Sequence, residues 1–380
     1  MKLRNLFLLG SIALMTMSCD KAEDSVEPSP MISVKSASIS LQIAGTEGLG
    51  TRSSGNPVQE EKVLKLDAFV FNADGSLEAY KTVTSTVNTI TKVDNIAVTN
   101  GAKKVFVLAN YAGDASLIKT LEDLKKVSAD LKNEKDNGRL TMSTDLADVT
   151  ILPGKNYIGY SSSVTDGTSL APHTYSLVRL VSRVKIEDMQ WQSSEYSFED
   201  QTAFVLNAAK NSFLVSSSSV AAPSAYYEGL AGSGDLFPSA STVLTGADNF
   251  LTTVASNNNT YFYLYENQPV NDVMNYPTIL VIRAKVKQNN VYVSNIPGRV
   301  DANGYTYFPV IINKGGVSST VSGATDGHTY IKRNNTYNIK TVVKGLGTSN
   351  PFSSAAPSSL SAQVNVATWA LNISQTDIFE

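Results

Sequence analysis

Few residues of this chain combine a type and a spacing that could support catalysis. The 380 residues include two histidines, His173 and His328, and both lie in loop-like segments without a candidate nucleophile beside them. We therefore expect both at the surface. Glu195, Glu199 and Asp200 form a small acidic group in a polar segment, where such residues are usually solvated. A secreted hydrolase with two carboxylates distant in sequence stays an alternative, but the sequence itself predicts no catalytic site.

Two further segments could bind a phosphate or a cation. Residues 345–350, GLGTSN, resemble a glycine-rich nucleotide loop but lead into Pro351 and not into a helix. Residues 72–75, NADG, lack the bidentate glutamate that a calcium loop requires, so a hairpin turn is expected there. A single cysteine excludes an intrachain disulfide and a thiolate zinc site. We predict no cofactor and no metal site.

The composition indicates a β-rich exported protein. The formal net charge is -3 and no cluster of Lys and Arg stands out, which argues against a nucleic-acid partner. Charged residues make up only 17%, while Ser, Thr, Asn, Gly and Val are plentiful, as in proteins built from many short strands and polar turns. The length is sufficient for two domains.

Cys19 has the most specific local context. A basic start at Lys2 and Arg4 precedes an apolar stretch over 6–17, and TMSC ends at Cys19. The apolar stretch is too short to span a bilayer comfortably. This order resembles a bacterial lipobox, in which the cysteine is acylated and becomes the mature amino terminus; an ordinary signal peptide with an incidental cysteine is the alternative. We expect an extended tether after it, because the next segment is acidic and contains prolines.

Alternation of apolar and polar residues predicts strands along most of the chain. Ile39, Leu41 and Ile43 share one face of a first strand, which a loose Gly/Thr/Ser-rich segment containing Arg52 follows. Residues 114–134 keep leucines at helical spacing and predict the clearest helix. We predict a mainly β chain of two β-sandwich domains of Greek-key, transthyretin-like type, with one or two helices in the first domain.

Tyr261, Tyr263 and Tyr265 alternate in a further predicted strand and would share one face. A platform for sugar stacking is conceivable, but packing between sheets or in an interface is the expected role. The Ser/Ala/Gly-rich stretch 216–241 is expected to be an extended surface loop.

The carboxyl end also has the pattern of a strand. Val364 and Val366 alternate in one register, and Trp369, Leu371 and Ile373 alternate in the opposite one. This change predicts a bulge or bend near 367–368. A turn-rich linker precedes the segment, and an apolar strand at a chain terminus invites pairing with another molecule.

Several of these segments carry a family resemblance by their order and spacing. They are the lipobox Cys19, GTEGLGTR, KLDAFVFNADGSLEAY, KKVFVLANYAG, GKNYIGYSS, VRLVSRVKI, YPTILVIRAKV, GYTYFPVIIN, IKRNNTYNIKTVVKGLGTSNP and AQVNVATWAL. With them the chain resembles the FimA-type major fimbrillins, pilus subunits of Bacteroidetes that assemble from outer-membrane lipoproteins.

The resemblance implies a non-enzymatic function at the cell surface. An arginine-specific surface protease would cut after Arg52, so that the mature subunit begins at Ser53 and loses the strand with Ile39, Leu41 and Ile43. The carboxyl-terminal donor strand of another copy would fill the groove and build a head-to-tail polymer. Anchor and tip subunits are further implied partners, the lipid would hold the precursor at the outer membrane, and the fimbria would mediate adhesion and colonisation. The alternative is a monomeric surface lipoprotein that binds glycans or host proteins.

The expected organisation follows from these interpretations. It comprises a lipoprotein signal peptide (1–18), a tether with the removable first strand (19–52), an amino-terminal β-sandwich (53–188), a carboxyl-terminal β-sandwich (189–359) and a donor strand (360–380), with Val364, Val366, Trp369, Leu371 and Ile373 as its apolar residues.

Overall fold

A computed structural model describes most of the chain after its amino-terminal segment. The described residues are 35–45, 60, 62–136, 139–160, 164–216, 226–227, 252–257, 260–268, 276–314, 328–353 and 359–368. They form many strands and a few short helices, so the prediction of a mainly β fold is confirmed. The described residues, from Lys35 onward, belong to one compact unit.

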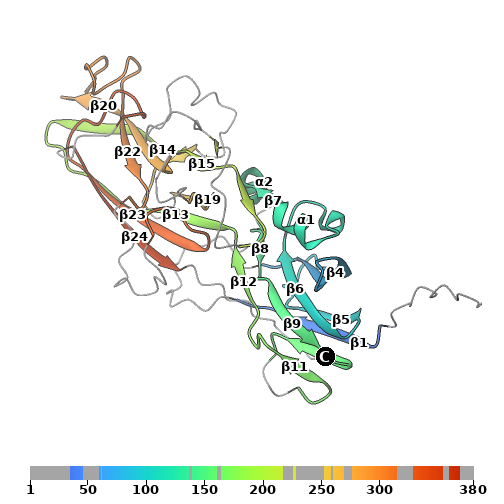
Figure 1. Cartoon of the computed structure of the whole chain (residues 1–380). Helices are drawn as coiled ribbons and strands as arrows, with labels where there is room; N and C mark the ends of the chain where they lie inside the picture. The colour runs from blue at the N-terminus through green and yellow to red at the C-terminus, as the bar shows by residue number, and fades with distance from the viewer. Residues whose placement is uncertain are drawn as a thin grey trace, which may run out of the picture. The chain divides into compact units, whose positions relative to one another are not determined.

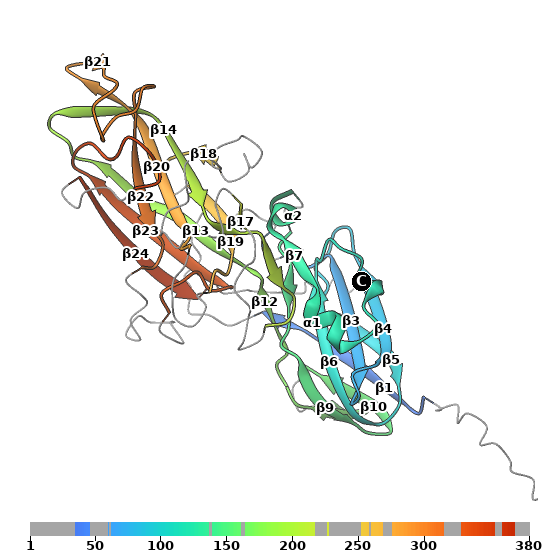
Figure 2. The same ribbon diagram turned by 45° about the horizontal axis from the view of Figure 1, so that its top comes forward.

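The first sheet holds the first strand in its interior. Strand β1 (Ala37–Gln42) pairs in parallel with β10 (Gly154–Ile158) on one side and antiparallel with β5 (Lys92–Val98) on the other. Strand β11 (Thr168–Leu170) pairs with β10 and completes the order β11-β10-β1-β5. Figures 1 and 2 show β1 in blue beside the strands with which it pairs.

The second sheet is larger and has the order β2-β12-β8-β6-β3-β4, with β9 also paired to β6. Its strands are β2 (Ala44–Gly45), β12 (Ser176–Arg179), β8 (Met142–Ser143), β6 (Gly101–Ala109), β3 (Lys65–Asn72), β4 (Leu77–Thr84) and β9 (Ala147–Ile151). The turn predicted at NADG joins β3 to β4, and there the Gly75 N–H donates to the Asn72 carbonyl over 2.9 Å. Gly75 has φ +86°, a conformation that favours glycine.

The prediction of one helix over 114–134 is wrong. The segment contains a 3₁₀ turn η1 (Ala115–Leu117), helix α1 (Leu121–Lys126), strand β7 (Ser128–Asp130) and helix α2 (Leu131–Asp136). Thr120 caps α1, since its side chain accepts the Asp123 N–H, and Val127 ends α1 with extended backbone angles. Pairing of β7 with β16 (Asn211–Phe213) keeps the middle of the segment extended, so tertiary contacts override the helical spacing.

The carboxyl-terminal half forms two further sheets. One has the order β19-β13-β23-β24, with β13 (Val181–Trp191), β19 (Thr260–Tyr265), β23 (Asn335–Val343) and β24 (Leu360–Thr368). The other contains β14 (Tyr196–Leu206), β18 (Thr252–Val254), β20 (Ile279–Gln288), β21 (Val291–Tyr292) and β22 (Tyr305–Ile311). A short pair joins β15 (Ala208–Ala209) to β17 (Tyr226–Tyr227). The expected boundary between residues 188 and 189 falls inside β13.

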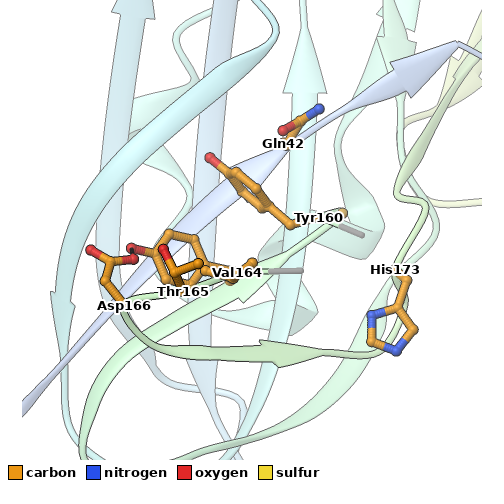
Figure 3. Close-up of a pocket in the computed structure, with 8 residues that line it drawn as sticks. Gln42, Tyr160, Val164, Thr165, Asp166 and His173 are labelled. Atoms are coloured by element: carbon orange, nitrogen blue, oxygen red, sulfur yellow. Dashed lines mark hydrogen bonds between the residues drawn. The ribbon is translucent and has the colours of Figure 1, made fainter. Parts of the chain in front are cut away.

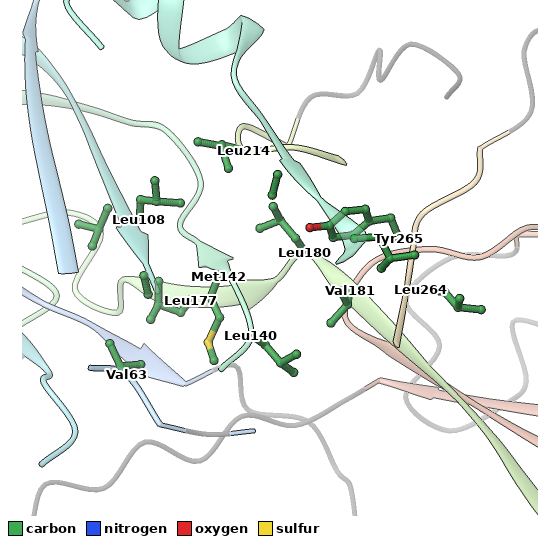
Figure 4. Close-up of a cluster of buried hydrophobic side chains, with 14 of the residues drawn as sticks. Val63, Leu108, Leu140, Met142, Leu177, Leu180, Val181, Leu214, Leu264 and Tyr265 are labelled. Atoms are coloured by element: carbon green, nitrogen blue, oxygen red, sulfur yellow. The ribbon is translucent and has the colours of Figure 1, made fainter. Parts of the chain in front are cut away.

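The two halves share one hydrophobic core. One cluster of buried side chains runs from Ile39 in β1 to Val343 in β23 and includes residues of both halves. Figure 4 shows a part of it, in which Leu180 and Val181 stand at the start of β13 with Tyr265 nearby. The pairing of β16 with β7 adds backbone hydrogen bonds between the halves. The junction between the halves is therefore held both by apolar packing and by strand pairing.

Glu134 on α2 is buried at this junction. Its carboxylate accepts the Thr141 N–H and the Tyr265 hydroxyl, each over 2.7 Å. Burial raises the pKa of the Glu134 carboxyl, and the two hydrogen bonds oppose this rise only in part. The folded chain therefore binds a proton at Glu134 more tightly than the unfolded chain does.

The raised pKa of Glu134 predicts a specific pH dependence of stability. A carboxyl whose folded-state pKa is raised favours folding below its unfolded pKa, and this contribution is lost as the pH rises through the folded-state pKa. We expect the wild-type chain to lose stability relative to Glu134→Gln between about pH 4 and about pH 7. Urea unfolding midpoints of both chains at the two pH values would measure this change in relative stability. Glu122→Gln is the control, because the Glu122 side chain on α1 is exposed, and parallel profiles of wild type and Glu134→Gln would contradict the expectation.

Candidate functional site

The first strand supplies a continuous row of buried apolar side chains. Ile39, Leu41 and Ile43 are 0%, 1% and 3% exposed, and Ala37 is buried as well. The backbone of β1 also bonds to a neighbour on each side, with Ile39 opposite Asn156 of β10 and Ile96 of β5. Loss of this strand would leave β5 without a described partner and β10 with β11 alone, and it would expose the core between the sheets.

Polar groups of the neighbouring strands also hold β1. The Ser40 hydroxyl accepts the Asn95 N–H over 3.1 Å, at the bulge where the pairing of β1 with β5 shifts. Asn156, 1% exposed, donates from its side chain to the Ser38 carbonyl over 3.3 Å. The same amide bonds to Leu152 O over 2.7 Å, so the groove around β1 already contains a positioned donor.

Gly159 allows the end of β1 to pass close to the chain after β10. A Cβ at this position would lie 1.8 Å from the Gln42 carbonyl oxygen, and Gly159 has φ +80°. Both the close approach and the positive φ require glycine. Beyond this point the Ile43 N–H donates to Thr91 O and the Ala44 N–H donates to Tyr175 O, each over 2.9 Å. The strand thus passes from the first sheet into β2 of the second.

A pocket of about 540 Å³ opens beside Gln42 at the end of β1. Tyr157 and Tyr160 line it with ring centroids 5.0 Å apart, and Asp166 and His173 lie at its rim (Figure 3). The Asp166 carboxylate forms an ion pair with Lys155 and accepts a hydrogen bond from the Tyr157 hydroxyl, each over 2.7 Å. These contacts lower the pKa of the Asp166 carboxyl, so it stays ionised and engaged within the protein.

Glu60 lies between the segment that contains Arg52 and β3, and it is buried. Its carboxylate is 3.2 Å from a guanidinium nitrogen of Arg183 on β13 and accepts the hydroxyl of Tyr263 on β19. Burial raises the pKa of the Glu60 carboxyl, against the opposing effects of Arg183 and Tyr263. Glu60 therefore ties the amino-terminal half to a sheet of the carboxyl-terminal half.

The last described strand lies at a sheet edge. Strand β24 pairs antiparallel with β23 from Leu360 opposite Val343 to Thr368 opposite Asn335, without a shift of register. Val364 and Val366 thus belong to the chain's own sheet. Among the described residues β24 has a strand on one side only.

Several predicted site residues lie outside the described residues. They are Cys19, Arg52, Ser53, Trp369, Leu371 and Ile373. The loop expected at 216–241 also lies there, except for Ser216, Tyr226 and Tyr227.

The tyrosines and histidines have mostly structural surroundings. Tyr265 is buried and bonds to Glu134, while Tyr263 bonds to Glu60, so these two pack between elements as expected. The surface position expected for His328 is wrong: it is 7% exposed and its Nε2 lies 2.9 Å from the Tyr337 hydroxyl. His173 is exposed as expected.

The acidic group around Glu199 and the glycine-rich segment 345–350 make structural contacts in the carboxyl-terminal sheets. Glu199 pairs with Lys287 over 2.7 Å, and Asp200 pairs with Lys285 over 3.1 Å, both at the surface. Gly347 packs against the Tyr307 carbonyl, where a Cβ would approach to 2.1 Å. No group of three metal-ligating side chains occurs in the described part of the chain. None of the helices described is long and apolar enough to cross a membrane.

Sequence reasoning missed three residues of the groove and its surroundings. Asn156 and Gly159 both lie in GKNYIGYSS, where a glycine directly after a strand is the signal that could have pointed to a close backbone approach. Glu60 gave no such signal, because its partners Arg183 and Tyr263 are far away in sequence.

Fold and site together define a β-sandwich protein whose first strand fills an interior place in a sheet. Comparison with family models matches residues 37–184 to the major fimbrial subunit protein (FimA) and residues 181–369 to the FimA4 pilin C-terminal domain. The chain is 30% identical to a type-4 major fimbrium subunit FimA of Porphyromonas gingivalis, over 96% of each chain. It is 28% identical to a type-2 subunit of that species, over 98% of each chain.

Solved structures agree with these matches. A fimbrilin from Porphyromonas gingivalis W83 superposes with a TM-score of 0.72 at 25% identity, covering 89% of this chain and 99% of that one. A putative cell adhesion protein from Parabacteroides distasonis shares the fold, with a TM-score of 0.63 at 21% identity, covering 88% of this chain and 98% of that one. The chain belongs to the FimA family of major fimbrial subunits. It is a structural component of a cell-surface fimbria and not an enzyme.

The contact between Gly159 and Gln42 leads to a mutational prediction. Gly159→Ala should destabilise the chain by about 1–3 kcal/mol for the strained backbone and by a further amount for the clash with β1. Gly154→Ala is the matched control, because Gly154 has φ +91° but no atom within 4 Å of an added Cβ. Denaturant unfolding would measure both variants. Equal losses of stability would show that the close approach of β1 carries no cost.

Proposed function

We propose that this subunit polymerises by exchange of its first strand for the carboxyl-terminal tail of another copy. The observation that carries this proposal is the place of β1 between β10 and β5, with Ile39, Leu41 and Ile43 buried. Burial of three such side chains stabilises the fold by about 5–9 kcal/mol, at about 1.5–3 kcal/mol each. A whole domain has a net stability of about 5–15 kcal/mol. An empty groove would therefore strongly favour capture of a replacement strand.

A cut in the segment after β2 would make this strand removable. Arg52 lies between Gly45, the last residue of β2, and the buried Glu60. Cleavage between Arg52 and Ser53 would leave Glu60 and its pair with Arg183 in the mature subunit. The new amino terminus would thus stay attached to the carboxyl-terminal half, while β1 and β2 would lose their covalent link to the rest of the fold.

The proposed donor strand is shorter than the whole segment 360–380. Because β24 completes the chain's own sheet with nine residue pairs, we assign Val364 and Val366 to the subunit's own fold. Trp369, Leu371 and Ile373 then supply the apolar residues of the donor. With this assignment, a subunit can donate its tail while most of its own edge strand β24 stays paired with β23.

Export and attachment complete the proposed pathway. Residues 1–18 would act as the signal peptide, and acylation of Cys19 would hold the precursor at the outer membrane until an arginine-specific surface protease acts. Anchor and tip subunits would end the filament, which would serve adhesion and colonisation. We also propose two sandwich domains that meet near residue 181, where β13 begins and where one family match gives way to the other.

Substitution of Arg52 should separate cleavage from folding. We expect Arg52→Ala and Arg52→Lys to stay monomeric with an arginine-specific protease, because neither offers the scissile residue. Trypsin also cuts after lysine, so it should cleave Arg52→Lys at this position and allow it to polymerise. It should not do so for Arg52→Ala. Electron microscopy and an SDS-resistant ladder on gels would report polymers. Filaments of Arg52→Ala would reject the role of Arg52, and a wild type without any ladder after cleavage would favour a monomeric surface binder.

Removal of the tail should make a subunit that accepts but cannot donate. A chain ending at Thr368 keeps β24, so its stability should match that of the full chain before cleavage. After cleavage it should not polymerise alone, and when mixed with wild-type subunits it should shorten their filaments by capping one end. A chain lacking only residues 377–380 is the control and should polymerise. Long filaments of the chain ending at Thr368 would place the donor elsewhere.

A further inference from the structure

The first strand and the tail have closely similar sequences. Residues 37–44 read ASISLQIA and residues 367–374 read ATWALNIS. Three positions are identical, since Ala37, Leu41 and Ile43 correspond to Ala367, Leu371 and Ile373. All three identities fall on side chains of the first strand that are buried. The identities therefore fall on the face of the first strand that contacts the core.

The positions between the buried ones agree in character. Gln42 is half-buried and corresponds to Asn372, another side-chain amide, and Ser38 corresponds to Thr368, another hydroxyl. Ala44 corresponds to Ser374, which is also small. The small residue Ala370 takes the place of Ser40, which is buried against the bulge of β5. The largest difference is Trp369 in place of Ile39.

A shift by two residues fits the groove less well. It would place Gln375 at the position of Ile43, which is 3% exposed, and Trp369 at the position of Ala37, which is 7% exposed. A buried glutamine side chain is costly unless its amide finds partners. A shift by one residue would turn every apolar side chain of the tail toward the opposite face.

On the basis of the proposed strand exchange, we infer that the tail enters the groove in one register, with Leu371 in the place of Leu41 and Ile373 in the place of Ile43. The incoming chain then runs parallel to β10 and antiparallel to β5, as β1 does. Residues 369–374 occupy the groove without using any residue of β24. Thr368 and Ala367 reach the outer positions only if the last two pairs of β24 with β23 open.

This register places Asn372 opposite Lys92 of the next subunit. In the present structure Gln42 is the antiparallel partner of Lys92, and Lys92 is exposed. Directly opposed residues on antiparallel strands have Cα atoms about 4.5–5.5 Å apart, within the range that a disulfide spans. The register shifted by two would instead place Ser374 opposite Lys92.

Cysteine pairs test the register in assembled filaments. The full-length variant with Lys92→Cys and Asn372→Cys should form disulfide-linked ladders after cleavage and mild oxidation, on denaturing gels without reductant. The matched variant with Lys92→Cys and Ser374→Cys should form few or none. Cleavage after Arg52 removes the native Cys19, so no other thiol remains in the mature subunit.

Each outcome of this experiment decides the inference. Ladders with the cysteine at 374 but not at 372 would shift the register by two and overturn it. Filaments of both variants without disulfides would also overturn it, while strand exchange as the assembly mechanism would stand. Failure of the unmodified chain to polymerise after cleavage would reject strand exchange itself, and the register with it.

A gain of affinity offers an independent test. With Ala370 at the place of Ser40, the Asn95 N–H loses the hydroxyl that accepts it at 3.1 Å. Ala370→Ser should restore this hydrogen bond and slow the dissociation of filaments in denaturant about two- to tenfold. Asn372→Ser, which would meet the same N–H only in the register shifted by two, is the control. A slower dissociation for Asn372→Ser alone would overturn the inferred register.

Discussion

The pairing of β1 on both of its edges is the interaction on which the rest of the amino-terminal half depends. Strand β10 has β11, of three residues, on its other side, and the described part of the sheet gives β5 no second partner. The two neighbours of β1 are therefore held in one sheet largely through β1 itself. The apolar row from Ala37 to Ile43 then closes the core against the second sheet. Any change at β1 acts on backbone pairing and on apolar burial at once.

The carboxyl-terminal half depends on the first half through a few buried polar groups as well as through the shared core. Glu60 meets Arg183 and Tyr263, and Glu134 meets Tyr265, so two carboxylates of the first half contact strands β13 and β19. A buried carboxylate is costly unless it is paired or hydrogen-bonded, and both of these have such partners. Neither contact involves β1, so the junction between the halves can persist whatever fills the groove.

Much of the fold could be predicted from alternation of apolar and polar residues, because that alternation reports directly which strand face is buried. The pattern of Ile39, Leu41 and Ile43 predicted a half-buried strand, and these side chains are buried. The helix over 114–134 could not be excluded in this way, since its leucines keep helical spacing while the partner that extends β7 lies more than 80 residues further along the chain. Glu60 was unpredictable for the same reason, because its partner Arg183 lies more than 100 residues further along the chain.

The contrast between β1 and β24 would explain why the proposed strand exchange needs a cut in the chain. While β1 is covalently attached, its effective concentration in the groove is about millimolar or higher, and a tail from another copy competes poorly. If the link after β2 were broken as proposed, β1 would become a separate ligand that dilutes away when it dissociates. The tail stays joined to β24 and to the whole subunit behind it. In the proposed exchange, every tail captured would add a subunit with a groove of its own, so an exchange that is unfavourable before cleavage would become directional afterwards.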